Sequence, residues 1–279
     1  MATTAAGATA GNGGDAPMAG EPGERGISRR SSVAVLERHL VLHRRLWRAS
    51  AASSFLMPLM IVAGFGLGVG GYIGQVQGVD YLAWIVPGVL ASTAFQVAVG
   101  ETTWPVFGDF KWVRAYHAMR ATPVRVADIV AGGLLFVLLR VVSSVLIVCA
   151  VTAAFGALRS PWALLTPLVC GLVGLAAAAP TTAFAATVSH DSYFVLLFRF
   201  GVVPAMLFGG VFFPVEQLPA VARPVAYVSP LWHGVELQRA ATLGAAPHWP
   251  VAVHVAYLLA VTAAGTFLAL RAFRRRLQD

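Results

Sequence analysis

Residues 210–239 read GVFFPVEQLPAVARPVAYVSPLWHGVELQR and combine a mostly apolar composition with four prolines and four charged side chains. The charged residues are Glu216, Arg223, Glu236 and Arg239. Each proline lacks a backbone N–H and ends or kinks a helix, so the stretch cannot form one uninterrupted membrane span. It is also too apolar for a solvated loop. We therefore expect two short helices, near 216–226 and 229–242, that enter a membrane from one side and return to that side.

The composition of the whole chain also indicates a membrane protein. Of its 279 residues, 58% are hydrophobic and only 11% are charged, whereas soluble domains carry about 25% charged residues. A chain of this length cannot bury so much apolar sequence in a soluble core. The net charge of +8 does not indicate nucleic-acid binding. The basic residues flank apolar segments, where they act as topology signals and contact membrane lipids.

Charge-poor intervals of about 20 residues, the length that crosses a bilayer as a helix, predict six membrane spans. They lie near 53–75, 81–101, 129–157, 162–188, 193–213 and 250–270. The expected fold class is an all-α polytopic membrane protein. Two arginines fall inside these spans. Arg140 either faces protein or a water-filled cavity, or extends back to the inner surface, whereas the position of Arg199 favours extension to the inner surface.

The positive charges predict the orientation. Fifteen of the 20 Lys and Arg residues lie in the segments that share a side with the N-terminus, and three lie in the segments on the other side. Because cytoplasmic segments carry the excess of positive charge, both termini are expected in the cytoplasm. The chain is then a multi-pass protein of the cytoplasmic (inner) membrane. Residues 213–249 then fall on the outer side.

Two segments precede the first span. Residues 1–31 form a tail, rich in small residues, Gly and Pro over 1–26, and are expected to be disordered. Residues 32–48 predict an amphipathic helix, with Leu36, Leu40 and Trp47 near one face and Arg44 and Arg45 on the other. Its place just before the first span favours a helix on the membrane surface over an ordinary packing helix.

The longest inner connection, residues 101–128, mixes aromatic and basic side chains. A short amphipathic helix over about 109–121 would carry Trp112, Arg114, Tyr116, Met119 and Arg120. The Thr122-Pro123 pair then predicts a helix start, with Thr122 as N-cap and Pro123 at the first helical position. Such a surface is either an anchor in the membrane interface or a docking site for a soluble partner, and spacing alone does not decide between them.

A glycine-rich stretch, GFGLGVGG at 64–71, lies inside the first predicted span. It matches G-x-G-x-x-G, but a dinucleotide site needs a strand, a turn and a later acidic residue, which an uncharged membrane span does not provide. Gly64, Gly66, Gly68 and Gly70 instead form overlapping small-xxx-small spacings, which are typical of close helix packing. The packing partner is either another helix of the same subunit or a second subunit.

The sequence offers no enzyme site. The spans contain no acidic residue well inside them, and His254, the one histidine within them, has no evident nucleophile to assist, so we predict no catalytic residue. His39 and His43 have no obvious third ligand, so we predict no metal site. An intramembrane enzyme and an ion-coupled transporter are therefore disfavoured. No G-x-x-x-x-G-K-[ST] phosphate loop occurs, and Lys111 is the only lysine, so we expect no cofactor in this chain.

Two motifs bring a family resemblance. AMRATPVRVADIVAG (118–132) and FFPVEQLPAVARPVAYVSPLWHGVELQR (212–239) resemble the signature regions of the ABC-2 type transporter permeases. In the second motif, the FFP, QLP, PL and H-x-V-E elements match in order and spacing. The resemblance is closest to the nodulation-type lipooligosaccharide export permeases, with daunorubicin-type drug export permeases further off. It covers roughly residues 33–275, and the long N-terminal tail departs from the pattern.

This resemblance implies a permease that forms a homodimer or a heterodimer and works with a separate ATP-binding subunit, which binds ATP and Mg. The transmembrane domain would span 32–275, followed by a cytoplasmic tail at 276–279. The helix at 32–48 resembles the family's elbow helix and the helix at 109–121 its coupling helix. The outer pieces resemble re-entrant helices at the exit of the translocation path. The hypothetical path residues are Arg140, Phe212, Phe213, Pro214, Glu216 and Glu236. The expected substrate is amphipathic, lipid-linked or glycolipid-like, and the alternative within the family is a hydrophobic drug or antibiotic.

Overall fold

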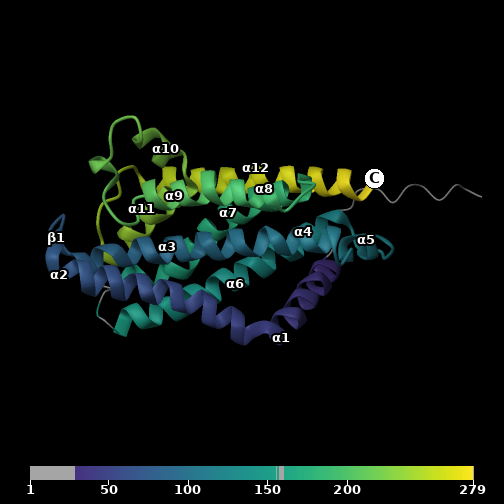
Figure 1. Cartoon of the computed structure of the whole chain (residues 1–279), viewed down its shortest axis with the longest axis horizontal. Helices are drawn as coiled ribbons and strands as arrows, with labels where there is room; N and C mark the ends of the chain where they lie inside the picture. Colours follow the sequence, from purple (N-terminus) through teal and green to yellow (C-terminus); the bar gives the residue numbers. More distant parts are fainter. Residues whose placement is uncertain (1–28, 155, 157–159, 279) are drawn as a thin grey trace, which may run out of the picture.

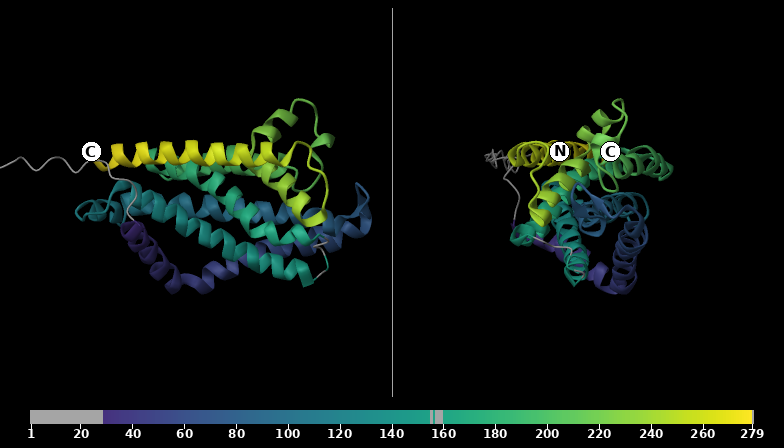
Figure 2. Two further views of the ribbon diagram at one scale, coloured as in Figure 1. Left: turned by 180° about the vertical axis from the view of Figure 1, so that it is seen from behind. Right: turned by 90° about the vertical axis from the view of Figure 1, so that its left-hand side faces the viewer.

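The computed structural model describes the backbone of residues 29–154, 156 and 160–278. What the sequence predicts for residues 1–28 and 279, for the side chains of Arg45 and Trp47, and for the surroundings of Gly66 lies outside the described residues. The described chain is an elongated bundle of helices that run along its long axis (Figures 1 and 2). Its one small sheet is the hairpin of β1 (Gln75–Val76) and β2 (Val79–Asp80).

Four described helices are long and apolar enough to cross a membrane. They contain α3 (Tyr81–Thr102), α6 (Val126–Ala154), α7 (Thr166–Thr187) and α12 (Val251–Gln278). A short 3-10 turn, η2 (Pro161–Leu165), leads into α7. These helices coincide with the second, third, fourth and sixth predicted spans, although α12 continues past residue 270 to Gln278.

The first and fifth predicted spans correspond to shorter apolar helices, Pro58–Ile73 and Ser192–Phe208. The fifth consists of α8 (Ser192–Leu197), the π-helical turn η3 (Phe198–Val202) and α9 (Val203–Phe208). The first ends in the π-helical turn η1 (Val62–Val69) and α2 (Gly70–Ile73). That these two segments also cross the membrane, which would give six crossings in all, therefore remains a prediction.

The N-terminal helix differs from the predicted separate elbow. Helix α1 runs without interruption from Arg29 to Ile61 and so joins residues 32–48 to the start of the first apolar segment. Figures 1 and 2 show α1 bent between its purple N-terminal part and its blue C-terminal part. The N-terminal part packs on α6, where Val35 is buried and the hydroxyl of Ser32 donates to Asp128 at 3.2 Å.

The single helix predicted over 109–121 is wrong. The chain forms α4 (Trp104–Lys111) and α5 (Ala115–Arg120), separated by residues 112–114. The break occurs because Arg114 has a left-handed backbone with φ of 53°. The predicted N-cap is also wrong. Thr122 lies in a turn, and α6 begins at Val126, where Asp128 accepts the backbone N–H of Arg125 at 3.3 Å.

The proline-rich stretch folds as a short 3-10 turn, a short α-helix and one longer α-helix. The 3-10 turn η4 (Val215–Gln217) and α10 (Arg223–Val228) replace the helix predicted over 216–226, since Pro219 and Pro224 interrupt it. The second predicted helix is present as α11 (Pro230–Leu243), capped by the Ser229 hydroxyl, which accepts the N–H of Leu231 at 3.3 Å. Most of α11 is buried, and it packs on α3, α7, η2 and α12.

The main core lies between α3, α6, α7 and α11, and its close approaches depend on glycines other than the predicted ones. A Cβ at Gly265 of α12 would lie 2.6 Å from the backbone nitrogen of Pro180 in α7, and one at Gly234 would lie 2.4 Å from a methyl of Val173. In contrast, Gly64 and Gly68 have nothing within 4 Å, and Gly70 meets Tyr81 only at ordinary contact distance. The predicted small-residue packing therefore does not occur at Gly64 and Gly68 within one subunit.

Candidate functional site

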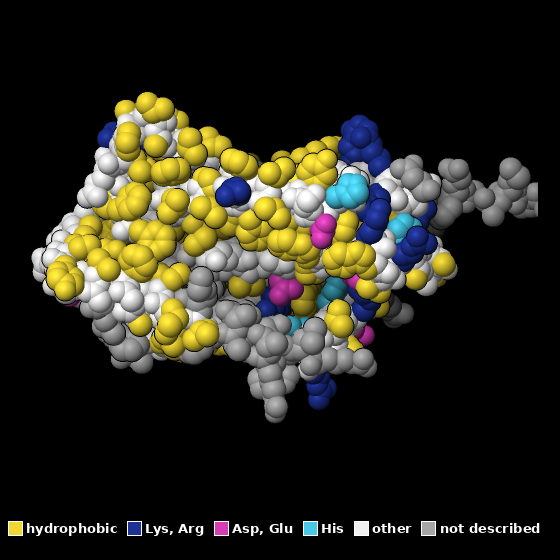
Figure 3. All heavy atoms as spheres, in the orientation of Figure 1, with side chains coloured by type: hydrophobic (Ala, Val, Ile, Leu, Met, Phe, Trp, Pro, Cys, Tyr) yellow, Lys and Arg dark blue, Asp and Glu magenta, His cyan; other side chains and the backbone are white. Residues whose placement is uncertain are grey.

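The two ends of the bundle have different chemistry. Figure 3 shows Lys and Arg gathered at the end where the C-terminus lies, with hydrophobic side chains covering most of the remaining described surface in this view. We call this the basic end, formed by α4, α5 and the last turns of α12. The opposite end carries α2, the β1–β2 hairpin, α10 and α11 (Figure 1).

The break between α4 and α5 presents an exposed surface at the basic end. The N–H groups of Trp112 and Val113 both donate to the carbonyl of Gly108, at 2.9 Å each, so the chain turns out of α4. The Trp112 ring then lies over Gly108 and meets Phe107 edge-on at 5.6 Å. Trp112 remains 61% exposed and Val113 68% exposed, which leaves an apolar surface open to a partner.

The predicted coupling residues divide into two sets. The exposed set comprises Trp112, Arg114, Arg120, Thr122 and Pro123. Tyr116 is buried, with its ring 4.7 Å from Phe110 and 5.1 Å from Phe273 of α12, and Met119 is half-buried. Burial raises the pKa of Tyr116, so this side chain stays a neutral phenol that ties α5 to α4 and α12.

An ion pair connects α4 to the N-terminal part of α1. Both terminal nitrogens of Arg38 donate to Asp109, at 2.9 and 2.8 Å, in a two-pronged arrangement. This hydrogen bond raises the pKa of Arg38. Leu36 is half-buried, whereas Leu40 and Arg44 are exposed. The helix that begins the chain's described part is thus held directly to the segment that carries the exposed surface.

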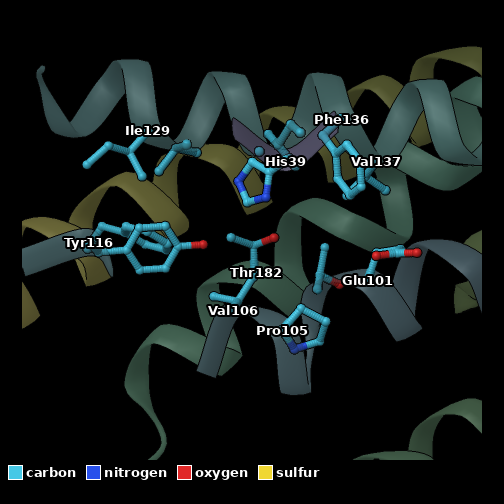
Figure 4. A pocket seen from close by; sticks show the side chains of 14 residues that line it. His39, Glu101, Pro105, Val106, Tyr116, Ile129, Phe136, Val137 and Thr182 are labelled. Carbon is cyan, nitrogen blue, oxygen red and sulfur yellow. The ribbon is translucent and has the colours of Figure 1, made fainter. Parts of the chain in front are cut away.

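A small cavity lies where α1, α3, α4, α5, α6, α7 and α12 meet, and it is lined by His39, the neighbour of Arg38 in sequence. In Figure 4, His39 enters the cavity from α1, and the hydroxyl groups of Tyr116 and Thr182 face the same space. His39 stacks on Phe136 with ring centres 5.1 Å apart, and burial lowers its pKa, which favours the neutral ring. The cavity measures about 40 Å³, which is too small for a substrate, so we interpret it as a gap where the helices pack and not as a binding site. His43 meets the same Phe136 edge-on, and the described residues contain no group of three or more metal-ligating side chains.

The Arg140 side chain faces the protein interior. It is 8% exposed, and its Nε donates to Glu101 at 3.0 Å, which joins α6 to the end of α3. The structure thus favours the first of the two interpretations of this arginine. Phe212 lies near Tyr81, at the other end of α3, since the Tyr81 hydroxyl donates to the Phe212 carbonyl at 3.3 Å. Twenty residues of helix separate Tyr81 from Glu101, or about 30 Å, so Arg140 does not share a site with Phe212.

The other predicted path residues gather at the opposite end, and several are occupied by internal contacts. Glu236 accepts from Arg239 at 3.3 Å and from the backbone N–H of His248 at 2.8 Å. Glu216 is exposed and lies 3.7 Å from His248. Pro214 is buried, whereas Phe212 and Phe213 are half-buried. Glu216 is therefore the one acid of this pair with free surface.

Sequence reasoning missed two buried groups at this end. His233 of α11 and His254 of α12 face each other with their Nδ1 atoms 2.9 Å apart, and the Nε2 of His233 lies 3.0 Å from the Tyr227 carbonyl. Arg239 is buried with its guanidinium 4.1 Å above the Trp84 ring and donates to the Gly210 carbonyl. The charged residues of 210–239 marked this region, but no sequence spacing connects residues that lie on different elements.

A larger apolar groove runs between these ends. It has a volume of about 370 Å³ and is lined by residues of α3, α7, η3, α9 and α10, including Phe95, Phe184 and Phe200. Thr181 and Ser229 are its polar side chains, and no charged side chain lines it. Such a groove suits an apolar chain and selects weakly among ligands of that kind.

Comparisons with known proteins found matches over most of the chain. A family model described as ABC-2 type transporter matches residues 31–243. Nodulation protein J of Rhizobium leguminosarum bv. trifolii is 31% identical over 245 residues, which cover 88% of this chain and 93% of that protein. Nodulation protein J of Rhizobium meliloti (strain 1021) is 29% identical over the same shares. That of Azorhizobium caulinodans is 24% identical over 73% of this chain and 80% of its own length.

Proposed function

Because the chain belongs to the ABC-2 type transporter family, we propose that it is the membrane-spanning permease subunit of an ATP-driven exporter. ATP and Mg would be bound by a separate ATP-binding subunit, since this sequence has no phosphate loop. Two permease subunits, identical or different, would form the path. The protein would lie in the cytoplasmic membrane with both termini inside, as the distribution of positive charge favours.

The observation that carries this proposal is the exposed surface at the α4–α5 break. Trp112 and Val113 are apolar and exposed, and the same segment carries the exposed basic residues Arg114 and Arg120. The same segment is tied to three other elements, through Arg38 of α1, Phe273 of α12 and the direct connection from α3. A soluble subunit that moves this surface would therefore move several helices together.

We propose an amphipathic, lipid-linked or glycolipid-like substrate. Several relatives are named nodulation protein J, and the second sequence motif resembles lipooligosaccharide export permeases. The apolar groove of about 370 Å³ offers space for an acyl chain. A hydrophobic drug would fit the same groove, so drug efflux is the second candidate. ATP-dependent uptake of a radiolabelled lipooligosaccharide and of a hydrophobic dye into the same inverted vesicles separates the two, because only a transported compound accumulates in the lumen.

The exposed surface at the α4–α5 break, formed by Trp112 and Val113, is the proposed docking surface, and a charge placed on it tests the proposed partner. We expect Val113→Asp to reduce recovery of the ATP-binding subunit, and substrate-stimulated ATP hydrolysis, by at least tenfold, because the variant buries a carboxylate in an apolar contact. Val221→Asp is the matched control, since Val221 is 88% exposed at the opposite end. Both variants should insert and unfold like the natural protein. Full export by Val113→Asp would overturn this docking surface.

A further inference from the structure

A second cleft lies at the basic end and shares two lining residues, Pro180 and Phe184, with the apolar groove. It lies between the end of α7 and the last turns of α12, beside the end of α4, and has a volume of about 750 Å³. Its charged lining residues are Lys111, Arg271, Arg275 and Arg276, and no acidic side chain lines it. The acidic residue nearest in sequence to the end of α7, Asp191, is not part of the lining.

Within the described residues, one of these four cations is engaged by the protein and three are not. Arg276 donates to the carbonyls of Ala185 and Ala186 at 3.0 Å each and lies 4.5 Å from the Phe110 ring, so it closes the end of α7. Lys111, Arg271 and Arg275 are exposed and make no ion pair with any described residue. Arg271 and Arg275 are four positions apart on one helix and therefore project from the same face.

The cleft also has an apolar side. Leu268 lies one turn before Arg271 on α12, and Pro180, Ala183 and Phe184 of α7 form the facing wall. Pro180 and Phe184 also line the apolar groove of about 370 Å³. A molecule with a negative head and an apolar chain would therefore match the cleft along its length, with the head at the arginines and the chain toward α7.

We propose that this cleft binds the headgroup phosphate of an anionic phospholipid from the membrane leaflet at the basic end. Unpaired arginines present donors in a planar fork that matches two phosphate oxygens, and Lys111 adds a third positive charge. Basic pockets between transmembrane helices on the cytoplasmic side are a recurring form of anionic lipid recognition. The bound lipid would link α12 to α7 and α4 at the end that the docking surface occupies.

The test uses the purified full-length permease in a neutral detergent, titrated with phosphatidylglycerol and, separately, with phosphatidylcholine. We expect preferential binding of phosphatidylglycerol, read by native mass spectrometry. Arg271→Gln/Arg275→Gln should weaken it about 30-fold, given the usual contribution of each basic residue to anionic-lipid binding. Arg274→Gln is the matched control, because it removes the same charge from the same helix but does not line the cleft, and it should weaken binding less than about threefold.

Three results would overturn the proposal. Equal binding of the two lipids, or equal weakening in Arg274→Gln and the double variant, would mean that the cleft does not select the anionic head. Displacement of phosphatidylglycerol by an equal concentration of glycerol phosphate would mean that the apolar wall is not used. A double variant that keeps phosphatidylglycerol but loses the ATP-binding subunit would assign the cleft to a protein partner. Thermal unfolding without lipid checks that the variant folds.

Discussion

Gly132 and Gly133 are neighbours in α6 but have different surroundings. A Cβ at Gly132 would lie 2.8 Å from the Ser32 carbonyl and 2.8 Å from the Cβ of Val35, both in α1, whereas Gly133 has nothing within 4 Å. We expect Gly132→Ala to lower the free energy of unfolding by about 1–3 kcal/mol, because α1 must move away from α6. Gly133→Ala should leave it unchanged or raise it by up to about 1 kcal/mol, since alanine favours the helix.

The measurement is denaturant unfolding of both variants in the same detergent. Equal stabilities would show that α1 does not approach α6 as closely as the Ser32 and Val35 distances indicate. The comparison is sharp because both changes add one methyl group to the same helix. It therefore isolates the contact with α1 from any effect of alanine on helix formation.

At the scale of single residues, the sequence indicated which side chains were unusual but not their partners. Arg140 stood out as a charge within a span, yet its partner Glu101 is 39 positions away on another helix. The glycines of 64–71 were chosen for their regular spacing, whereas the close approaches occur at Gly132, Gly234 and Gly265. Spacing reports which residues share a helix face, and only the tertiary packing decides which face meets a neighbour.

At the scale of elements, Arg114 tests the break between α4 and α5. Its backbone is left-handed, with φ of 53° and ψ of 28°, a conformation that glycine adopts at no steric cost and a β-branched residue tolerates poorly. We expect Arg114→Gly to keep stability or raise it by up to about 1 kcal/mol, and Arg114→Val to lower it by about 1–2 kcal/mol. Both variants remove the same charge, so each controls for the other.

Thermal unfolding of the two purified variants supplies the measurement. A continuous helix over 109–121 would reverse the order, because glycine inside a helix costs up to about 1 kcal/mol relative to alanine and valine costs less. A more stable valine variant would therefore contradict the separation of α4 from α5.

Long elements could be predicted and short ones could not. The spans predicted at 81–101 and 129–157 correspond closely to α3 and α6, because an interval free of charge marks where a helix can lie in a membrane. The α4–α5 break has no such signal. Arginine does not favour a left-handed backbone. The break is accompanied by the packing of Tyr116 on Phe273 of α12, a contact between segments far apart in the sequence.

At the scale of the whole molecule, burial differs most between α3 and α12. Their most apolar 18-residue windows have similar mean hydropathy, 1.7 and 1.9, but 83% of the first window is buried inside the protein and only 17% of the second. Hydropathy could predict that both helices lie in a membrane. It could not predict that α3 lies at the centre and α12 at the edge, because lipid and protein interior are equally apolar.

This difference predicts how leucines respond to truncation. Leu90 of α3 is fully buried, whereas Leu259 of α12 is 53% exposed. We expect Leu90→Ala to lower the free energy of unfolding by about 2–5 kcal/mol, because it leaves a cavity in the core. Leu259→Ala should cost less than about 1 kcal/mol, since lipid fills the space. Unfolding in one lipid–detergent mixture provides the comparison, and similar losses for the two variants would place α12 in the core.

The facing rings of His233 and His254 have a consequence for motion at the end opposite the basic end. A carbonyl can only accept, so the Nε2–H of His233 donates to the Tyr227 carbonyl, and the Nδ1 of His233 accepts a hydrogen bond from the Nδ1–H of His254. This one-way chain of donors fixes the longitudinal register of the last helix against its neighbour. If α12 slid along α11 by one helical turn, the hydrogen bond between the two rings would be lost, among the aromatic side chains that surround them. If that end of the bundle changes shape, α11 and α12 should therefore travel as one block.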